Sequence, residues 1–265
     1  MPDGHFVREA VQLSKIVAAP VKVMWTRADD IQGGYYRPAY LHRIAGDVGK
    51  GGEILAWRHR IVGQSIMAGT AFEQTIVSNG IDRSSVYFPY YEWPNHRIEL
   101  HTTQLGIPVW SWRSVGATHN AFVIECFMDE LAHAAGKDPY EFRRALLAPR
   151  HHEALDLAAN KAGWNTKLPA GRGRGIAVYP FHSFVVQVVE VSIDASGFLK
   201  IDRVVCAVNC GTVVNPDIVR AQMEGGIAMG LSAALHEQVT FERGRVQQSG
   251  FADYPILCIQ IGRAS

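Results

Sequence analysis

Hydrophobic residues recur at the spacing of a helix face in several stretches of this chain, most clearly in its middle. Beyond residue 116, Ile124, Met128 and Leu131 fall on one side of a predicted helix. Asp138-Pro139 and Asn215-Pro216 each place a capping residue before a proline, which is typical of a helix start. The predicted helices cover residues 4–18, 117–135, 139–147, 152–162 and 216–235.

Alternating and continuous apolar runs predict strands between these helices. Residues 42–48 and 54–62 form one predicted hairpin, and residues 184–193 and 199–208 form another whose apolar runs indicate that both faces are covered. Further strands are predicted over 21–25, over 97–103 and in a hairpin over 239–246. This order predicts an α+β fold with mixed or antiparallel sheets and packed helices.

Two stretches lack such a pattern. Residues 63–94 carry many aromatic side chains but no clear period, which is typical of a segment that packs over a site or binds a partner. Residues 169–175 alternate glycine and arginine and predict a loop that serves as a hinge. We therefore expect a first subdomain over 1–168 and a second, β-rich one over 169–265 that holds a glycine-rich helix.

Composition narrows the class of protein. Lys and Arg number 26 and Asp and Glu 25, so no basic field indicates a nucleic-acid partner. No apolar run reaches the roughly 18–20 residues of a membrane span. The four cysteines are too few for a disulfide scaffold, and Cys206 and Cys210 have no second Cys or His pair at zinc-site spacing, so we expect both to be buried as small hydrophobic residues.

The candidate site begins at Trp110-Ser111-Trp112-Arg113-Ser114-Val115-Gly116. Aromatic side chains of this density cannot all be buried in one turn, so part of this surface is predicted to line a cavity. Because Arg113 and the N–H groups around Gly116 precede a helix, the turn is a candidate anion site. The alternative is an ordinary loop in which Arg113 pairs with an acidic side chain.

The predicted helix over 216–235 contains three interior glycines, Gly225, Gly226 and Gly230. Each costs about 1 kcal/mol of helix stability relative to alanine. Close approach to a ligand or to another backbone explains such glycines, and a plain helix–helix crossing explains them equally well.

Other chemistries have weaker support. The chain has no Gly-x-Ser-x-Gly; residues 63–69 are the nearest match and have the wrong spacing for a hydrolase nucleophile. Gly171-Arg-Gly-Arg-Gly175 is neither a dinucleotide-binding motif nor a P-loop. No residue of this chain is identified as catalytic or as a metal ligand, although the eleven histidines leave a cofactor-free hydrolase as an alternative.

Read together and in order, four segments resemble the molybdopterin-binding subunit of the xanthine oxidase family, and within it the isoquinoline 1-oxidoreductase and bacterial aldehyde oxidoreductase group. They are residues 20–30, Gly34-Tyr-Tyr-Arg-Pro38, Trp112-Arg-Ser-Val-Gly116 with its helix, and Asn215-Pro216 through Gly226. The resemblance covers about residues 5–257.

The resemblance implies roles for individual residues. Arg113, Ser114 and Gly116 would lie near the molybdenum cofactor, and Trp112 and Val115 would shape the substrate pocket. Gln222 would hydrogen-bond to the pterin, while Gly225 and Gly226 would let the helix approach it. The cofactor would be molybdopterin, in its cytosine dinucleotide form, with molybdenum.

The resemblance also implies an activity and partners. The activity is oxidative hydroxylation of an N-heterocycle or an aldehyde with water as the oxygen source, with electrons leaving through a small [2Fe-2S] subunit. The family's upstream glycine-rich and Met-Gly-Gln-Gly segments, and the downstream glutamate that acts as its general base, have no match here. We therefore expect a fragment, with any export signal upstream and with exposed apolar surface that favours self-association; a non-catalytic binding fragment is the alternative.

Overall fold

The computed structural model describes residues 4–78, 81–86 and 90–257. Its first sheet has the strand order β1-β2-β5, from β1 (Tyr40–Val48), β2 (Ile54–Gln64) and β5 (His96–Thr103). β1 and β2 pair antiparallel, as the predicted hairpin requires, and β2 and β5 pair parallel. The sheet is therefore mixed.

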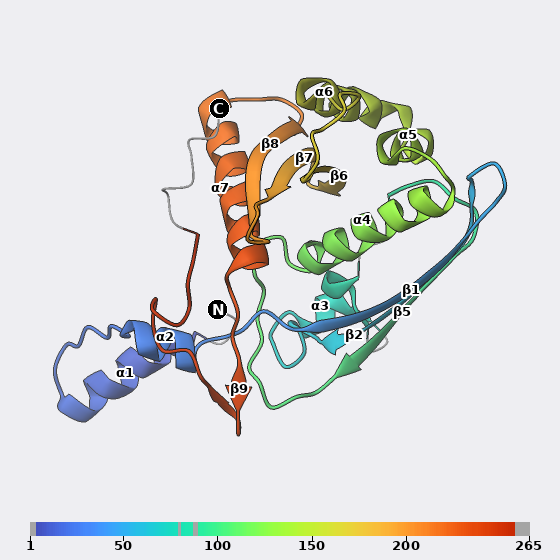
Figure 1. The fold of residues 1–265 in the computed structure, drawn as a ribbon. Helices are drawn as coiled ribbons and strands as arrows, with labels where there is room; N and C mark the ends of the chain where they lie inside the picture. The colour runs from blue at the N-terminus through green and yellow to red at the C-terminus, as the bar shows by residue number, and fades with distance from the viewer. Residues whose placement is uncertain (1–3, 79–80, 87–89, 258–265) are drawn as a thin grey trace.

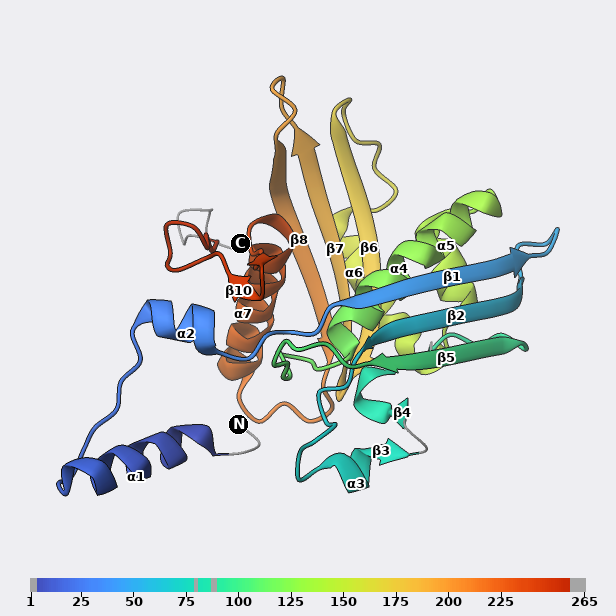
Figure 2. The same ribbon diagram turned by 90° about the horizontal axis from the view of Figure 1, so that it is seen from below.

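The second sheet is antiparallel, with the order β6-β7-β8 from β6 (Arg172–Phe181), β7 (Ser183–Ile193) and β8 (Leu199–Asn209). Helix α4 (Ala117–Ala134) lies between the two sheets and contacts β1 and β6 (Figure 2). Helix α5 (Pro139–Leu146) packs against α4, and α6 (His152–Ala162) packs against α5 and covers β7 and β8. The α+β prediction is confirmed.

One hydrophobic core joins these elements. Ile124, Met128 and Leu131 of α4 are buried in it, as their spacing predicts, together with Trp57 of β2 and Phe142 of α5. The core thus fixes α4, and with it the turn before residue 117, against both sheets.

The two ends of the chain are less buried. Helix α1 (His5–Val17) has no buried residue, and it lies with α2 (Arg27–Gly33) at one side of the molecule (Figure 1). Helix α7 (Pro216–Leu235) stands beside β8, away from α5 and α6, and Ser232 is the single buried residue among its twenty. Exposed apolar side chains on both helices, such as Ile16 and Ile218, are consistent with the predicted self-association, which stays a prediction.

The remaining elements are short. α3 (Glu73–Ile76), β3 (Val77–Ser78), β4 (Ile81–Asp82) and η1 (Arg83–Ser85) occupy the stretch without a clear period. η2 (Pro149–His151) precedes α6, and β9 (Phe241–Glu242) and β10 (Arg245–Val246) form the predicted last hairpin. Within the described residues, no helix combines the length and the apolar character that crossing a membrane requires.

Several local predictions are wrong. Residues 21–25 alternate like a strand but pair with no other strand of the described chain. Residues 27–33 lie outside the predicted helices but form α2, because Thr26 and Asp29 complete a capping box. The tract 169–175 is not wholly a loop, since β6 begins at Arg172 and its main chain pairs with β7. Cys206 and Cys210, expected to be buried, are only half-buried.

Candidate functional site

The turn before α4 has an unusual backbone. Ser114 and Val115 both lie in the left-handed region, with φ of 68° and 51°. Hydrogen bonds from Val115 N to Trp112 O and from Ala117 N to Ser114 O, both 2.9 Å, hold this conformation. A β-branched residue there costs on the order of 1–3 kcal/mol, and such strain concentrates at functional sites.

Gly116 is required by close packing. A Cβ at this position would lie 2.1 Å from the carbonyl oxygen of Ser84, which is backbone and cannot move aside easily. Asn120 joins the same two segments, because its Nδ2 donates to Gly116 O at 2.8 Å and to Ser85 O at 3.1 Å. The turn is thereby fixed between α4 and η1.

Arg113 reaches from this turn to the glycine-rich helix α7. Its Nη2 donates to Gln222 Oε1 at 2.8 Å and lies 3.4 Å from Gln222 O. Two segments 109 positions apart in the sequence thus meet at this pair. Among the described residues Arg113 pairs with the Gln222 amide and with no acidic side chain, which is against the alternative of an Arg113–acid pair.

The glycines of α7 form an open face beside Arg113. Gln222, Gly225 and Gly226 lie at i, i+3 and i+4 and so share one side of the helix. A Cβ at Gly226 would meet only the Arg113 guanidinium, at 3.8 Å from Nη2, and a Cβ at Gly225 or Gly230 would have no atom within 4 Å. No helix crosses at these glycines within the described residues. An exposed backbone, an amide and a guanidinium therefore converge where a polar group can approach closely, and this donor set fits a pterin cofactor.

The predicted substrate residues line a small cavity beside the turn. Its volume is about 10 Å³, and its walls include Arg37, Trp112, Val115, Gly116 and His119. The Arg37 guanidinium carbon lies 5.1 Å from the centre of a Trp112 ring, a cation–π distance. A cavity of this size admits one water molecule or one heavy atom of a ligand.

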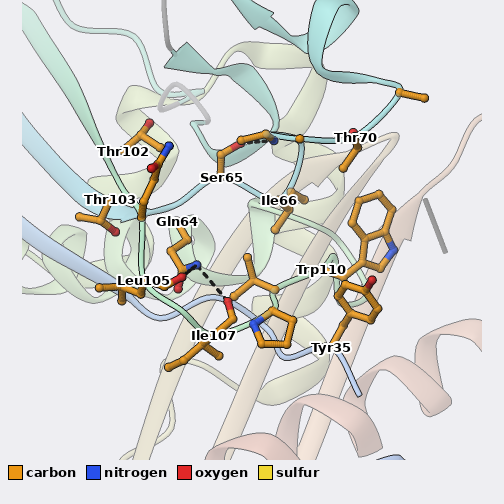
Figure 3. A pocket seen from close by; sticks show the side chains of 16 residues that line it. Tyr35, Gln64, Ser65, Ile66, Thr70, Thr102, Thr103, Leu105, Ile107 and Trp110 are labelled. Atoms are coloured by element: carbon orange, nitrogen blue, oxygen red, sulfur yellow. Dashed lines mark hydrogen bonds between the residues drawn. The ribbon is translucent and has the colours of Figure 1, made fainter. Parts of the chain in front are cut away.

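A larger pocket of about 650 Å³ adjoins the start of the turn (Figure 3). Its walls come from residues 64–71 and 102–110 and from Tyr35, and they end at Trp110. Gln64 Nε2 donates to Ile107 O at 3.1 Å and ties the two walls together. This volume is typical of small-molecule pockets. The first part of the stretch without a clear period, residues 64–66 and 68–71, therefore supplies one wall of this pocket.

Sequence reasoning missed three histidines in the same region. His119 Nδ1 lies 3.0 Å from His42 Nε2, and His42 Nδ1 lies 2.8 Å from His59 Nε2. We call these three residues the histidine string. Tyr40 stacks on His119 with ring centres 3.8 Å apart, and its hydroxyl donates to Gln64 O at 2.8 Å. The sequence offered one signal for this cluster: His42 and His59 fall on two strands that are predicted to pair as a hairpin.

Burial keeps the histidine string neutral. Desolvation lowers the pKa of His42 and of His59 to about 4, and that of His119 to about 3. The neighbouring positive charge of Arg37 lowers the pKa of His119 further. Burial also raises the pKa of Tyr40 to about 12. At neutral pH, each ring of the string therefore acts through one N–H and one lone pair.

Comparison with known proteins assigns the class. Two models of the molybdopterin cofactor-binding domain match residues 8–147 and 114–260, each more than half of the chain. The chain therefore belongs to the molybdopterin cofactor-binding domain family, as the resemblance indicates, and molybdopterin is the cofactor of this family.

Two curated relatives align with most of this chain. The beta subunit of isoquinoline 1-oxidoreductase from Brevundimonas diminuta is 35% identical over 94% of this chain and 33% of its own length. A nicotinate dehydrogenase subunit from Pseudomonas putida is 31% identical over 94% of this chain and 23% of its own length. The chain thus spans about a third or less of these relatives.

Solved structures share the fold. Quinoline 2-oxidoreductase from Pseudomonas putida 86 superposes with a TM-score of 0.80 at 14% identity, over 94% of this chain and 57% of its own. A Cu,Mo-CO dehydrogenase superposes with a TM-score of 0.75 at 12% identity, over 97% and 58%. At these identities the likeness concerns the fold.

Proposed function

We propose that this chain is part of a molybdenum hydroxylase catalytic subunit that hydroxylates an N-heterocycle or an aldehyde, with water as the oxygen source. The observation that carries the proposal is the contact of Arg113 with Gln222 beside the open glycine face of α7. The names of the two curated relatives, which refer to isoquinoline and nicotinate, favour an N-heterocycle. Molybdopterin supplies the redox chemistry of the reaction when bound.

The residues of this chain bind and orient in the proposed role. Arg113, Ser114, Gly116, Gln222, Gly225 and Gly226 would hold molybdopterin, in its cytosine dinucleotide form. Arg113 brings a permanent positive charge with five N–H donors, which suits phosphate and pterin oxygens. Trp112 and Val115 would bound the substrate, and Gly116 keeps the turn close to η1 so that both side chains stay in place.

The proton acceptor of the reaction is not assigned to these residues. Glu224 lies in the same segment as Gln222, but two helical positions rotate its side chain by about 200° from the Gln222 face. We propose that the general base and a small [2Fe-2S] partner belong to the rest of the enzyme. The division into subdomains over 1–168 and 169–265 likewise remains a proposal, with α7 supplying the second half of the cofactor site.

The test is to express the 265-residue chain in a host that makes molybdopterin and to measure bound pterin and molybdenum per chain. We expect substoichiometric pterin in the wild type, and a several-fold loss in Arg113→Met and in Gln222→Met because each removes a polar partner. Arg220→Met is the matched control, since Arg220 is exposed on α7 and lies about 200° from the Gln222 face. No pterin in the wild type, or equal pterin in all four proteins, contradicts the proposal.

Dye reduction with isoquinoline and with benzaldehyde completes this test. We expect no turnover by the chain alone, because abstraction of a proton needs a base within about 2.6–3.2 Å. Stoichiometric molybdenum together with turnover would show that these residues suffice, and the assignment of the base to the rest of the enzyme would be wrong.

A further inference from the structure

Three neutral imidazole rings, joined by two hydrogen bonds, leave one N–H unused. Each neutral ring carries one N–H and one lone pair. The bonds from His119 to His42 and from His42 to His59 use two of the three protons. The third N–H must therefore lie at one end of the histidine string, either on His59 Nδ1 or on His119 Nε2, and a lone pair lies at the other end.

Asn120 decides between the two arrangements. Its Nδ2 donates to two carbonyl oxygens, Gly116 O and Ser85 O, so the orientation of its amide is fixed. The same Nδ2 lies 3.5 Å from His119 Nδ1, at the outer limit of a hydrogen bond. Both protons of this amide nitrogen are already given to the two carbonyl oxygens, so it makes no full hydrogen bond to the ring, but the positive end of the amide dipole still faces a lone pair more favourably than another N–H. His119 Nδ1 is therefore the acceptor, and the N–H of His119 lies on Nε2.

This choice determines the direction of the whole string. If His119 Nδ1 accepts, His42 Nε2 donates to it, and His42 Nδ1 then accepts from His59 Nε2. The unused lone pair lies on His59 Nδ1, a fully buried residue.

The free N–H lies at the end of the string that borders a cavity. His119 Nε2 and His59 Nδ1 are both buried, and neither has a hydrogen-bond partner in the part of the chain that the structure describes. Of the two rings, His119 lines the cavity beside Trp112 and Val115. A buried donor left unsatisfied costs about 1–3 kcal/mol, so a ligand atom that accepts from it gains that free energy on binding.

We propose that the histidine string holds His119 as a neutral Nε2–H donor towards this cavity, where it receives an acceptor atom of the substrate, a ring nitrogen or a carbonyl oxygen. The identity of the ligand rests on the proposed function, whereas the position of the proton does not. The lowered pKa values of the three rings agree with a neutral string.

The proton positions can be read by nitrogen-15 NMR on the 265-residue chain with labelled histidine at pH 7. Variants at 42, 59 and 119 assign the resonances. We expect all three rings to show a protonated Nε2 and an unprotonated Nδ1. A protonated Nδ1 on His119, or a doubly protonated ring in the string, overturns the proposal.

The ligand is tested on the same sample with isoquinoline and with naphthalene, which has the same shape but no acceptor. Isoquinoline should shift the His119 Nε2 resonance, and naphthalene should leave it in place. His119→Asn retains an acceptor near the position of Nδ1 but removes the cavity donor, so it should weaken isoquinoline binding about 5- to 10-fold. His133→Asn, at an exposed site on the same helix, is the matched control.

The outcomes separate this inference from the proposed function. An unshifted His119 with isoquinoline overturns the substrate assignment, even if the chain retains pterin. If inorganic phosphate shifts the His119 resonance and isoquinoline does not, the donor serves the cofactor, and the substrate assignment is again overturned. Loss of pterin binding with an intact isoquinoline shift contradicts the proposed function and leaves the donor assignment standing.

Discussion

Two buried polar clusters share helix α4 but differ in how completely their hydrogen bonds are satisfied. In the first, Glu125 Oε1 accepts from the hydroxyls of Tyr90 and Tyr91 at 2.5 and 2.8 Å, and Oε2 accepts from Arg143 Nε and Val178 N, both at 2.9 Å. We call this group the Glu125 cluster. The second is the histidine string, whose two end nitrogens have no partner among the described residues.

The Glu125 cluster joins separate parts of the fold. Arg143 of α5 is fully buried and also donates to Asp129 Oδ1 at 2.6 Å and to Glu125 O at 2.8 Å. Burial beside the Glu125 carboxylate raises the pKa of Tyr90 and Tyr91. With opposite charges in contact and both carboxylate oxygens bonded, such a cluster holds α4, α5 and β6 together and presents no group to a ligand.

The difference between the two clusters indicates which buried polar groups of this molecule are able to bind a ligand. A buried group whose partners are all internal contributes to the fold, whereas a buried group that lacks one is free to bind. The histidine string lies beside the strained turn at Ser114 and Val115, and the Glu125 cluster has no such neighbour in its own contacts. Substitutions in the Glu125 cluster, in the turn and in the histidine string test this difference.

Breaking the Glu125 cluster should have the largest effect. Arg143→Met leaves the Glu125 carboxylate buried beside no positive charge from α5, which costs about 3–5 kcal/mol of unfolding free energy. Urea denaturation measures the loss. Arg144→Met is the control, because Arg144 pairs with Asp156 at a partly exposed site and such pairs contribute about 0–1 kcal/mol. Equal losses of unfolding free energy in the two variants would show that the Glu125 cluster stabilises the fold no more than a partly exposed ion pair does.

Disturbing the turn beside the string should have the next largest effect. In Gly116→Ala the new Cβ would lie 2.1 Å from Ser84 O, so α4 and η1 must separate. We expect a loss of about 2 kcal/mol, typical of overpacking, together with altered His119 resonances. A neutral result in the same denaturation measurement would contradict the close packing described above.

The pH dependence of stability should come from the histidine string. The three folded pKa values of about 3 to 4 lie below the ordinary value of 6.5, so the unfolded chain binds more protons between pH 4 and pH 6.5. Stability is therefore complete above pH 6.5 and falls as the pH falls towards 4. His42→Asn should flatten this slope by up to about 1 kcal/mol per pH unit. An unchanged slope in His42→Asn would show that the folded chain does not lower the pKa of His42.

Much of the fold follows from local patterns, and the exceptions have physical reasons. Capping residues and one apolar face predict α4 through α7, because these signals act within a few turns. Residues 21–25 alternate between apolar and polar side chains as a strand does, but no strand of the described chain pairs with them. The alternation alone does not show whether a partner strand is present. β6 was missed because a strand rich in glycine pairs through its backbone and leaves no side-chain pattern.

The site was predictable only in part. The turn at Trp112–Gly116 and the interior glycines of α7 each lack a local reason, and the resemblance assigned both to one cofactor site; the direct contact of Arg113 with Gln222 was not predicted. The histidine string was not predictable in this way. His42, His59 and His119 meet only after β1, β2 and α4 have packed, and a lone histidine on an apolar face carries no signal of its neighbours.

The substitution with the smallest expected effect on stability is at Gly225, and it tests the cofactor site most directly. Gly225→Ala places a methyl group where no atom lies within 4 Å, and alanine favours the helix, so the free chain should gain about 0.5–1 kcal/mol. The measurement is bound pterin per chain after expression in a host that makes molybdopterin, with the unfolding free energy measured on the same preparations. If Gly225 lets α7 approach the cofactor, the variant is more stable and yet retains several-fold less pterin than the wild type. A variant that is more stable and retains as much pterin would contradict a cofactor on this face of α7.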